Sequence, residues 1–160
     1  MSKSIQKITP FLWFNQQAEE AARFYTSVFP NSRIKAITRY SAAGPGPEGS
    51  VMTVAFELDG QMFTALNGGP AFKFTEAVSF VVNCDTQQEV DDLWEKLSAG
   101  GDEIQCGWLK DKYGLCWQIV PAVFFDMIQD EDAARRERVI RAMFQMKKFD
   151  IAALEAAYRQ

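Results

Sequence analysis

The first half of the chain alternates between a strand pattern and a helix pattern. Residues 5–14 alternate well enough for a strand, and residues 15–29 place small and aromatic apolar side chains at helical spacing. Pro30 and Asn31 end the predicted helix, which Asn15 opens. Three further runs alternate as strands do, over residues 32–40, 51–58 and 61–67. The pattern therefore predicts a strand, a helix and three more strands.

Composition predicts how these strands are connected. Asp59–Gly60 lies between two predicted strands and is the kind of dipeptide that best suits a tight type I′ hairpin turn. Residues 41–50 are rich in glycine and proline, which cannot sustain a strand ladder. We therefore expect a hairpin at Asp59 and a mobile loop over residues 41–50.

The second half repeats the order of the first. Residues 77–84 read as a strand, and Asp85–Thr86 can cap a helix that runs to about Ala99 before Gly100–Gly101 end it. Residues 103–110 and 114–120 read as strands, with a turn through Asp111 to Gly114 between them. The ends of both halves also match, because Gly60 and Gly114 each precede an alternating strand with a polar residue four places on. This match favours an internal duplication.

After Pro121 the pattern becomes helical. Residues 131–147 are acidic at the start and basic at the end, as the helix dipole prefers, and Asp150 can cap a last helix to Tyr158. An apolar stripe with arginines around it is expected to pack on the sheet or on a second subunit while the arginines are solvated. The stripe is Val139, Ile140, Met143 and Phe144, and the arginines are Arg135, Arg136, Arg138 and Arg141. The organisation predicted is α+β, in one domain over residues 1–160: module one 1–70, module two 71–125 and a helical tail 126–160.

Charge and cysteine content narrow the classes of function. The formal net charge of −4 opposes nucleic-acid binding, and no stretch approaches the roughly 20 apolar residues that cross a bilayer. The stretch Met1 to Lys7 is polar and has no signal-peptide core, so we expect a cytoplasmic protein. The three cysteines are expected to be free thiols, and the chain has no histidine, the commonest general base and transition-metal ligand.

Four long motifs resemble the PhnB-like branch of the vicinal oxygen chelate superfamily, which includes glyoxalase I, bleomycin-resistance proteins and extradiol dioxygenases. The motifs are ITPFLWFNQQAEEAARFYTSVFPNS, LNGGPAFKFTEAVSFVVNCDTQQEVDDLWEKLSAGG, QCGWLKDKYGLCWQIVP and MFQMKKFDIAALEAAY. The resemblance implies two βαβββ modules that form a cupped mixed sheet around a pocket, with C-terminal helices, commonly in a homodimer. Some members are described as ubiquinone-pathway methyltransferases. Methyl transfer from S-adenosylmethionine usually relies on a glycine-rich turn between a strand and a helix that lets the backbone approach the cofactor. No such turn occurs in this sequence.

In the metal-using relatives, the first and last strands of each module supply the ligands. Carried over by position, these sites fall on Thr9 and Thr64 in module one and on Ser79 and Gln118 in module two. Uncharged hydroxyl and amide groups are weak donors for a divalent cation, so we expect no metal site and no cofactor. The alternative is a shifted alignment that turns a glutamate inward, with Glu57, Glu76 and Glu103 as the candidates.

Alternation places Thr9, Phe11 and Trp13 on one face of the first strand and Ile8, Leu12 and Phe14 on the other. In the last strand Cys116, Gln118 and Val120 share a face, while Leu115, Trp117 and Ile119 cover the helix, Trp117 as core. The cysteines are expected to be inert because no histidine can activate a thiol. The predicted ligand pocket is rich in aromatics and neutral polar groups: Thr9, Phe11, Trp13, Thr64, Asn67, Phe72, Ser79, Cys106, Trp108 and Gln118, with Phe74 beside them.

Two hypotheses of function follow from this pocket. The first is a non-catalytic binder of a small hydrophobic or aromatic molecule, without a metal. The second is a superfamily enzyme, such as a lyase, isomerase or dioxygenase, with a metal at positions assigned otherwise. A third hypothesis, that the aromatic surface serves protein association alone, remains open at this point, as does the packing of these aromatics as plain core.

Overall fold

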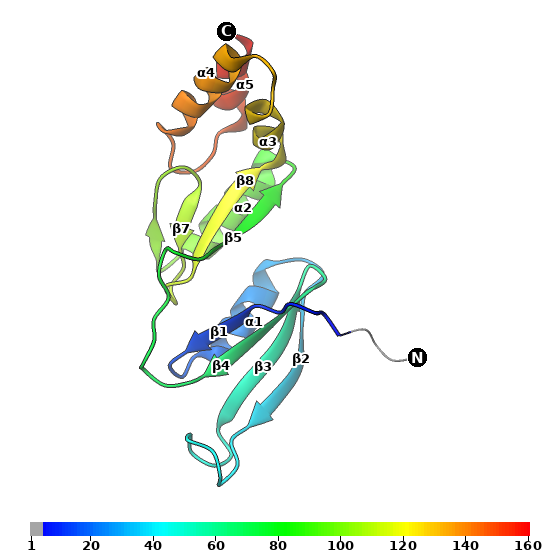
Figure 1. The fold of residues 1–160 in the computed structure, drawn as a ribbon, viewed down its shortest axis with the longest axis vertical. Coiled ribbons are helices and arrows are strands. Elements are labelled where there is room, and N and C mark those ends of the chain that lie inside the picture. Colours follow the sequence, from blue (N-terminus) through cyan, green and yellow to red (C-terminus); the bar gives the residue numbers. More distant parts are fainter. Residues whose placement is uncertain (1–4) are drawn as a thin grey trace. The chain divides into compact units, whose positions relative to one another are not determined.

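The structure is a computed structural model that describes residues 5–160, so most of the polar stretch Met1 to Lys7 lies outside it. The chain divides into two compact units, with the boundary between Lys73 and Phe74 (Figure 1). Each unit is described by itself. The predicted single domain stays a prediction, while the α+β class and the two βαβββ modules with C-terminal helices are confirmed.

The first unit holds the predicted strand–helix–three-strand order. Its elements are β1 (Phe11–Phe14), α1 (Ala18–Val28), β2 (Arg33–Arg39), β3 (Val51–Leu58) and β4 (Gln61–Asn67). The four strands form one mixed sheet in the order β1-β4-β3-β2. Only β1 and β4 are parallel, and the other neighbours are antiparallel.

The first strand is shorter than predicted because Pro10 has no N–H to offer to a ladder. The strand begins at Phe11, and the side chain of Gln6 takes over the pairing before it, accepting from the Met62 N–H at 3.0 Å and donating to the Met62 carbonyl at 3.1 Å. The expected alternation holds for Leu12 and Phe14, which are buried, but is wrong for Ile8, which is 83% exposed.

Helix α1 packs an apolar face on the sheet. Ala21, Ala22 and Tyr25 are fully buried, and Tyr25 stacks on Phe56, which in turn stacks on Phe63. Asn15 does not open this helix. The Ala18 N–H, at the start of helix α1, donates instead to the side-chain oxygen of Asn67 on β4.

The loop over residues 41–50 lies outside the ladder, as predicted, and it is folded onto one side chain. A Cβ added at Gly44 or Gly46 would lie 2.8 Å or 2.4 Å from the Tyr40 ring, so only glycine lets the backbone approach this ring so closely. The Tyr40 N–H donates to the Ser50 carbonyl at 2.9 Å, which closes the loop at its base. That the loop is mobile stays a prediction.

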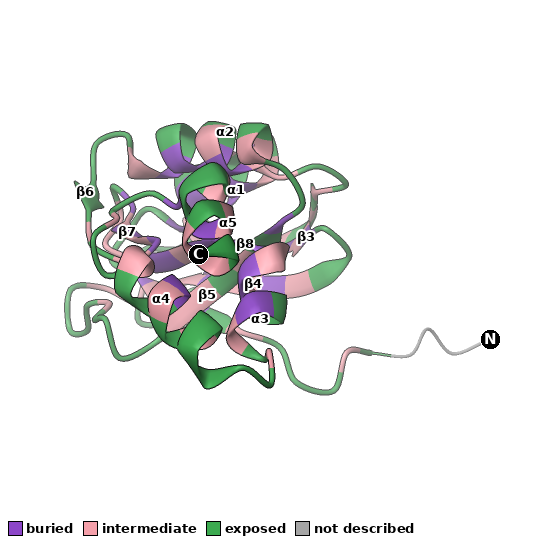
Figure 2. Cartoon of the chain, turned by 90° about the horizontal axis from the view of Figure 1, so that it is seen from above, coloured by how far each residue is buried: buried purple, intermediate pink, exposed green. Residues whose placement is uncertain are grey.

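The second unit repeats the arrangement of the first and adds three helices. Its modular part comprises β5 (Ser79–Cys84), α2 (Gln87–Ser98), β6 (Asp102–Glu103), β7 (Trp108–Lys110) and β8 (Cys116–Pro121). The sheet order is β5-β8-β7-β6, with β5 and β8 parallel. Helix α2 is capped as predicted, since the Thr86 side chain accepts from the Glu89 N–H. Figure 2 shows buried residues along one side of α2 and exposed residues along the other.

The predicted strand over residues 103–110 is interrupted. Cys106 and Gly107 have φ angles of 59° and 80°, a left-handed conformation that ends strand pairing between β6 and β7. Their N–H groups donate to the carbonyls of Met146 and Lys147, at 2.9 Å and 2.7 Å. The interruption is a tight turn between the antiparallel strands β6 and β7, closed by the Trp108 N–H, which donates to the Gln105 carbonyl at 3.1 Å, and the bonds to Met146 and Lys147 attach this turn to the tail.

The turn before β8 is built on Asp111, a buried charged residue that is 2% exposed. One carboxylate oxygen accepts from the backbone N–H groups of Tyr113 and Leu115, and the other accepts from the Trp117 indole at 2.9 Å. Trp117 itself is 2% exposed, so the prediction that it is core is confirmed.

In the structure the helical tail begins at Ala122, earlier than predicted. It contains α3 (Ala122–Ile128), α4 (Ala133–Met143) and α5 (Ile151–Arg159), and α4 and α5 lie side by side (Figure 1). Helix α3 was missed by the sequence pattern, and the predicted helix over residues 131–147 is shorter at both ends. Asp150 caps α5 as predicted, accepting from the Ala153 N–H at 3.0 Å. Within residues 5–160, no helix combines the length and apolar character that a membrane-spanning segment needs.

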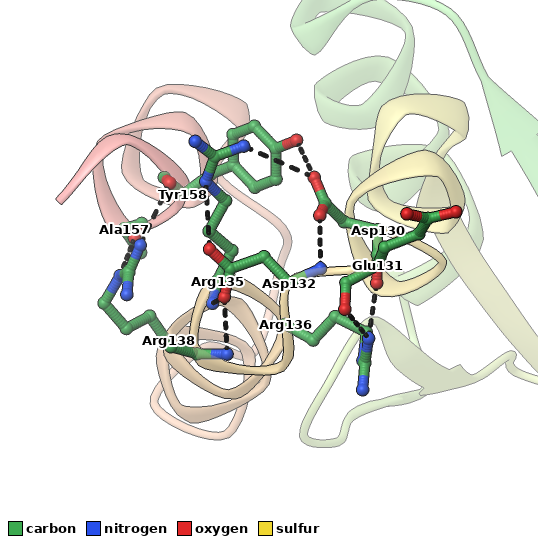
Figure 3. Close-up of polar contacts among 9 residues, drawn as sticks. Asp130, Glu131, Asp132, Arg135, Arg136, Arg138, Ala157 and Tyr158 are labelled. Carbon is green, nitrogen blue, oxygen red and sulfur yellow. Dashed lines mark hydrogen bonds and ion pairs between the residues drawn. The ribbon is translucent and has the colours of Figure 1, made fainter.

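The prediction that the tail arginines are solvated is wrong for two of them. Arg138 donates to the Ala157 carbonyl near the end of α5, and Arg136 donates to the carbonyls of Asp130 and Glu131 (Figure 3). The last carbonyls of a helix have no partner within it, so cationic donors are favoured there. These arginines tie the helices together.

Candidate functional site

A cavity of about 570 Å³ lies in the second unit, between the sheet and the tail. Strands β7 and β8 and the segment before them form one wall, and the tail forms the other. Its lining is mostly aromatic and aliphatic: Glu76, Ile104, Gln105, Cys106, Trp108, Gln118, Val120, Phe124, Phe125, Met143, Phe144 and Phe149. An apolar cavity of this size with few polar groups is typical of small-molecule sites.

Alternation along β8 decides which side chains reach this cavity. Gln118 and Val120 line it, while Trp117 and Ile119 are buried where α2 packs on the sheet. Cys116 was expected on the cavity face, but it is fully buried and is not among the lining residues. Burial raises the pKa of the Cys116 thiol, which keeps it protonated.

The polar centre of the cavity is an uncharged pair. The Gln118 amide nitrogen donates to the Ser79 hydroxyl at 2.8 Å, which joins β8 to β5. Within residues 5–160, every fully buried side-chain nitrogen or oxygen has a hydrogen-bond partner. The Gln118 Oε1 has no hydrogen bond from a described residue, so it must retain some access to the cavity.

One ion pair lies at the edge of the cavity. The Lys110 ammonium on β7 lies 2.5 Å from the carboxylate of Glu76, which lines the cavity. The hydrogen bond from Lys110 holds the pKa of the Glu76 carboxyl below its usual value. The Glu76 side chain is 59% exposed, so this pair is a solvated feature of the rim.

The ten predicted pocket residues divide between the two units. In the second unit, Cys106, Trp108 and Gln118 line the cavity, and Ser79 binds Gln118. In the first unit, Phe11 pairs in register with Thr64, and Trp13 meets the edge of Phe72 at 4.9 Å between ring centroids. Trp13 also donates to the Gly69 carbonyl at 2.9 Å. Thr9 is exposed and precedes β1. That these residues bind a ligand stays a prediction.

Asn67, another predicted pocket residue, also holds the first unit together. Its side-chain oxygen accepts from the Ala18 N–H at 2.8 Å, at the start of α1, and its side-chain nitrogen donates to the Val51 carbonyl. Asn67 also borders a second cavity of about 470 Å³, which the loop over residues 41–50 covers together with Tyr40. Because its amide oxygen and nitrogen already serve α1 and β3, Asn67 is less available to a ligand than Gln118.

The four positions that correspond to metal ligands in the superfamily do not fit a divalent cation. Ser79 and Gln118 bind each other, and Thr9 and Thr64 offer only hydroxyl groups. Within residues 5–160, no three Cys, Asp, Glu or His side chains gather as a metal site needs. Neutral weak donors do not compensate the dehydration of such a cation.

The alternative ligands each have a partner, and of the three only Glu76 lines the cavity. Glu57 lies 3.3 Å from Arg33 and 3.7 Å from Lys35 on the sheet of the first unit. Glu103 accepts from the Trp94 indole at 2.8 Å, and Glu76 pairs with a lysine as described. These contacts give each carboxylate a structural partner.

The sequence pattern missed the tail side of the cavity. Phe124 and Phe125 follow Pro121 directly, and the apolar run of which they are part was not recognised as helix α3. Met143 and Phe144 were recognised as an apolar stripe but not placed at the pocket. The cluster of phenylalanines after residue 120 indicates an apolar surface, but it does not show which part of the protein that surface packs against.

Two modules with parallel first and last strands and a cavity against the last strand define the fold of the vicinal oxygen chelate superfamily, as the resemblance predicted. The family model for 3-demethylubiquinone-9 3-methyltransferase matches residues 6–120, and the chain belongs to this family. No curated protein matches the chain.

Solved structures agree with this assignment. A Bacillus cereus protein described as a putative 3-demethylubiquinone-9 3-methyltransferase, PhnB protein, is 43% identical, with a TM-score of 0.68; the match covers 73% of this chain and 100% of that chain. Protein PA1353 from Pseudomonas aeruginosa is 22% identical, with a TM-score of 0.61, over 74% and 98% of the two chains. The fosfomycin resistance protein FosX from Mesorhizobium loti is 14% identical, with a TM-score of 0.50, over 75% and 92%, which shows the shared fold alone.

Proposed function

We propose that this protein binds a small, flat, mostly apolar molecule in the cavity of its second unit, without a divalent metal. The observation that carries this proposal is the aromatic cavity of about 570 Å³ with the neutral Gln118–Ser79 pair on its wall. Trp108 offers an aromatic face, and the amide offers orientation through hydrogen bonding. The physiological ligand is an aromatic or hydrophobic metabolite or toxin.

The family's description as a methyltransferase is a competing assignment for this chain. Both strand-to-helix connections, Asn15–Gln17 and Asp85–Thr86, lack glycine. A backbone without glycine at that turn has difficulty approaching a nucleotide-like cofactor closely. We therefore treat methyl transfer as an outcome to be tested beside ligand binding.

A thermal-shift experiment on the full chain separates the assignments. The probes are indole as a small aromatic, Ni²⁺, Mn²⁺ and Zn²⁺ as metals, and S-adenosylmethionine. A ligand at a hundredfold excess over its Kd stabilises a fold by roughly 2.7 kcal/mol, which is readily seen as a rise in Tm. We expect indole to raise the Tm and the other probes to leave it unchanged. Stoichiometric metal in the purified protein, or stabilisation by S-adenosylmethionine, would overturn the proposal.

Variants locate the site. Gln118→Ala and Trp108→Ala should reduce the indole response, since both side chains line the cavity. Trp13→Ala tests whether the first unit also contributes, as the predicted pocket requires. A protein that serves association alone would show no response to aromatic probes in any variant.

We further propose a cytoplasmic homodimer. The first unit exposes Phe11 and Phe72, at 60% and 65%, and such aromatic side chains favour an interface over open solvent. The three cysteines are free, as a reducing compartment requires. Light scattering coupled to gel filtration measures the mass, and a monomer at micromolar concentration would contradict the dimer.

A further inference from the structure

The tail lies beyond the part of the chain that defines the family. The family model ends at residue 120, and α3, α4 and α5 all follow that residue. Nevertheless, five of the twelve residues that line the cavity belong to the tail: Phe124, Phe125, Met143, Phe144 and Phe149. The side of the cavity opposite the sheet is therefore built from residues outside the family's common region.

Backbone hydrogen bonds fix the tail against the sheet. The carbonyls of Met146 and Lys147 accept from Cys106 and Gly107, as described above. Gln87 on α2 donates to the Phe149 carbonyl at 3.0 Å and accepts from the Ile151 N–H at 2.8 Å. These bonds clamp the segment before α5 between the sheet and α2.

The close approach at this clamp depends on glycine. A Cβ at Gly107 would lie 2.4 Å from the Phe149 ring, and its φ of 80° is disfavoured for other residues. Phe149 is 1% exposed and lies 5.1 Å from Phe124, ring centroid to ring centroid. The two rings form a buried floor.

The helices of the tail also hold one another. Figure 3 shows Arg138 reaching the end of α5, Arg136 reaching the carbonyls after α3, and Tyr158 donating to Asp130. Arg135 lies 3.6 Å from Asp130 and faces the Tyr158 ring. These contacts fix the tail helices relative to one another, so the aromatic side chains of the tail have defined positions.

Two aromatic side chains of the tail remain accessible at the cavity. Phe144, at the end of α4, is 61% exposed, and Phe125 is partly exposed. Across from the tail, the sheet contributes Trp108 and the amide of Gln118, whose Oε1 is not used by any described residue. The cavity thus combines aromatic surfaces on both walls with an available acceptor on the sheet side, the Gln118 Oε1.

We propose that the tail is the specificity element of this pocket: Phe144 and the β7–β8 wall select a planar aromatic molecule, and Gln118 Oε1 accepts one hydrogen bond from it. This inference rests on the proposed function and names its ligand class.

The test measures the affinity of the full chain for indole and for 1-methylindole by calorimetry. The two probes have nearly the same ring system, but only indole has a hydrogen-bond donor. We expect indole to bind about fivefold more tightly, since one net hydrogen bond contributes that order of free energy. Gln118→Leu should remove the preference while retaining 1-methylindole binding.

The tail is tested with two variants on the same helix. Phe144→Ala should weaken both probes about five- to tenfold, because it removes an aromatic face from the ligand. Ile140→Ala is the matched control: Ile140 is also on α4 and exposed, but it does not line the cavity, and its variant should bind within about twofold of wild type. Both variants should keep the wild-type Tm.

The outcomes separate this inference from the proposed function. If the wild-type chain binds indole but Phe144→Ala binds it equally well, the tail does not select the ligand and the inference falls while the binding function stands. Equal affinity for the two probes overturns the hydrogen bond to Gln118. If neither probe binds, both proposals fail together.

Discussion

The two units start from the same βαβββ module and differ in what covers their sheets. In each, a parallel pair of first and last strands lies beside two antiparallel neighbours. In the second unit, the tail packs against one face and encloses an aromatic cavity. In the first unit, Phe11 and Phe72 are exposed, and the side-chain amide of Asn67 is hydrogen-bonded to the start of α1 and to β3. A repeated fold therefore does not imply a repeated site.

The turns before the last strands show the same divergence at matched positions. Three residues before the turn glycines lie Glu57 and Asp111, and three residues after them lie Phe63 and Trp117. Asp111 is buried and accepts from Trp117, whereas Glu57, whose side chain is 18% exposed, forms ion pairs with Arg33 and Lys35, and Phe63, which has no donor, stacks on Phe56. The first unit has Phe63 where the second unit has Trp117. Its turn therefore has no indole N–H that needs a buried acceptor.

The largest expected effect is on the free energy of unfolding and distinguishes Asp111 from Glu57. Asp111→Ala leaves three N–H groups without their acceptor and should lower the free energy of unfolding by about 3 kcal/mol or more. Glu57→Ala, the matched control, should cost less than Asp111→Ala, because Arg33 and Lys35 are exposed and water can solvate them once the carboxylate is removed. Urea denaturation of both variants measures the difference, and equal costs would contradict the distinction drawn between the turns.

The next effect concerns ligand affinity at the two corresponding polar positions. Thr64 and Gln118 each lie four residues after a turn glycine, but only Gln118 lines the aromatic cavity of the second unit. Gln118→Leu should weaken indole binding about fivefold through the lost hydrogen bond, and Thr64→Val should leave it unchanged. Calorimetric titration decides this. A loss caused by Thr64→Val would mean that the first unit holds the ligand as well.

A further effect is expected in alkali. Phe14 and Cys84 occupy corresponding positions in the two units, because their strand partners, Asn67 and Pro121, each lie seven residues after the turn glycine, but only Cys84 can ionise. Burial raises the pKa of the Cys84 thiol to about 12. The unfolded thiol ionises near its ordinary pKa of about 8.5, so above that pH the folded state binds more protons and the free energy of unfolding falls as pH rises.

Cys84→Ala is the control for this pH dependence. The free energy of unfolding of the wild-type chain should decline more steeply between pH 8.5 and about 12 than that of the variant, measured by urea denaturation at each pH. Parallel curves for the two proteins would show that Cys84 does not contribute.

Local patterns were sufficient for most of the fold. Alternation, the Asp59–Gly60 turn and the caps at Thr86 and Asp150 each depend on neighbours in sequence, and the structure confirms them. The turn at Cys106–Gly107 is also local, closed by a bond from the Trp108 N–H to the Gln105 carbonyl, but a Cys-Gly dipeptide is a weaker hairpin signal than Asp-Gly, so the sequence predicted one continuous strand. Helix α3 was missed because it is short and because Pro121 before it indicated the end of an element rather than the start of one.

The candidate site was predictable only on its sheet side. The position of Gln118 after the turn glycine and the alternation along β8 led to Gln118 as a pocket residue; it lines the cavity, and its role in binding stays a prediction. The tail wall was not predictable, since an apolar stripe on a helix indicates that it packs but not on what. Asn67 was interpreted as a pocket group, and its use as a cap for α1 depends on a tertiary contact that no sequence pattern carries.

The most direct test of the central claim uses a probe already inside the second unit's cavity. Cys84 and Cys116 are fully buried with raised thiol pKa values, whereas Cys106 is partly exposed and lines the cavity. Treatment of the folded chain with iodoacetamide at pH 8, followed by peptide mass spectrometry, should modify Cys106 alone. Indole at a saturating concentration should slow that modification at least about fivefold, in line with its occupancy of the cavity. An unchanged rate at Cys106, with indole bound by calorimetry, would place the ligand elsewhere and contradict the account.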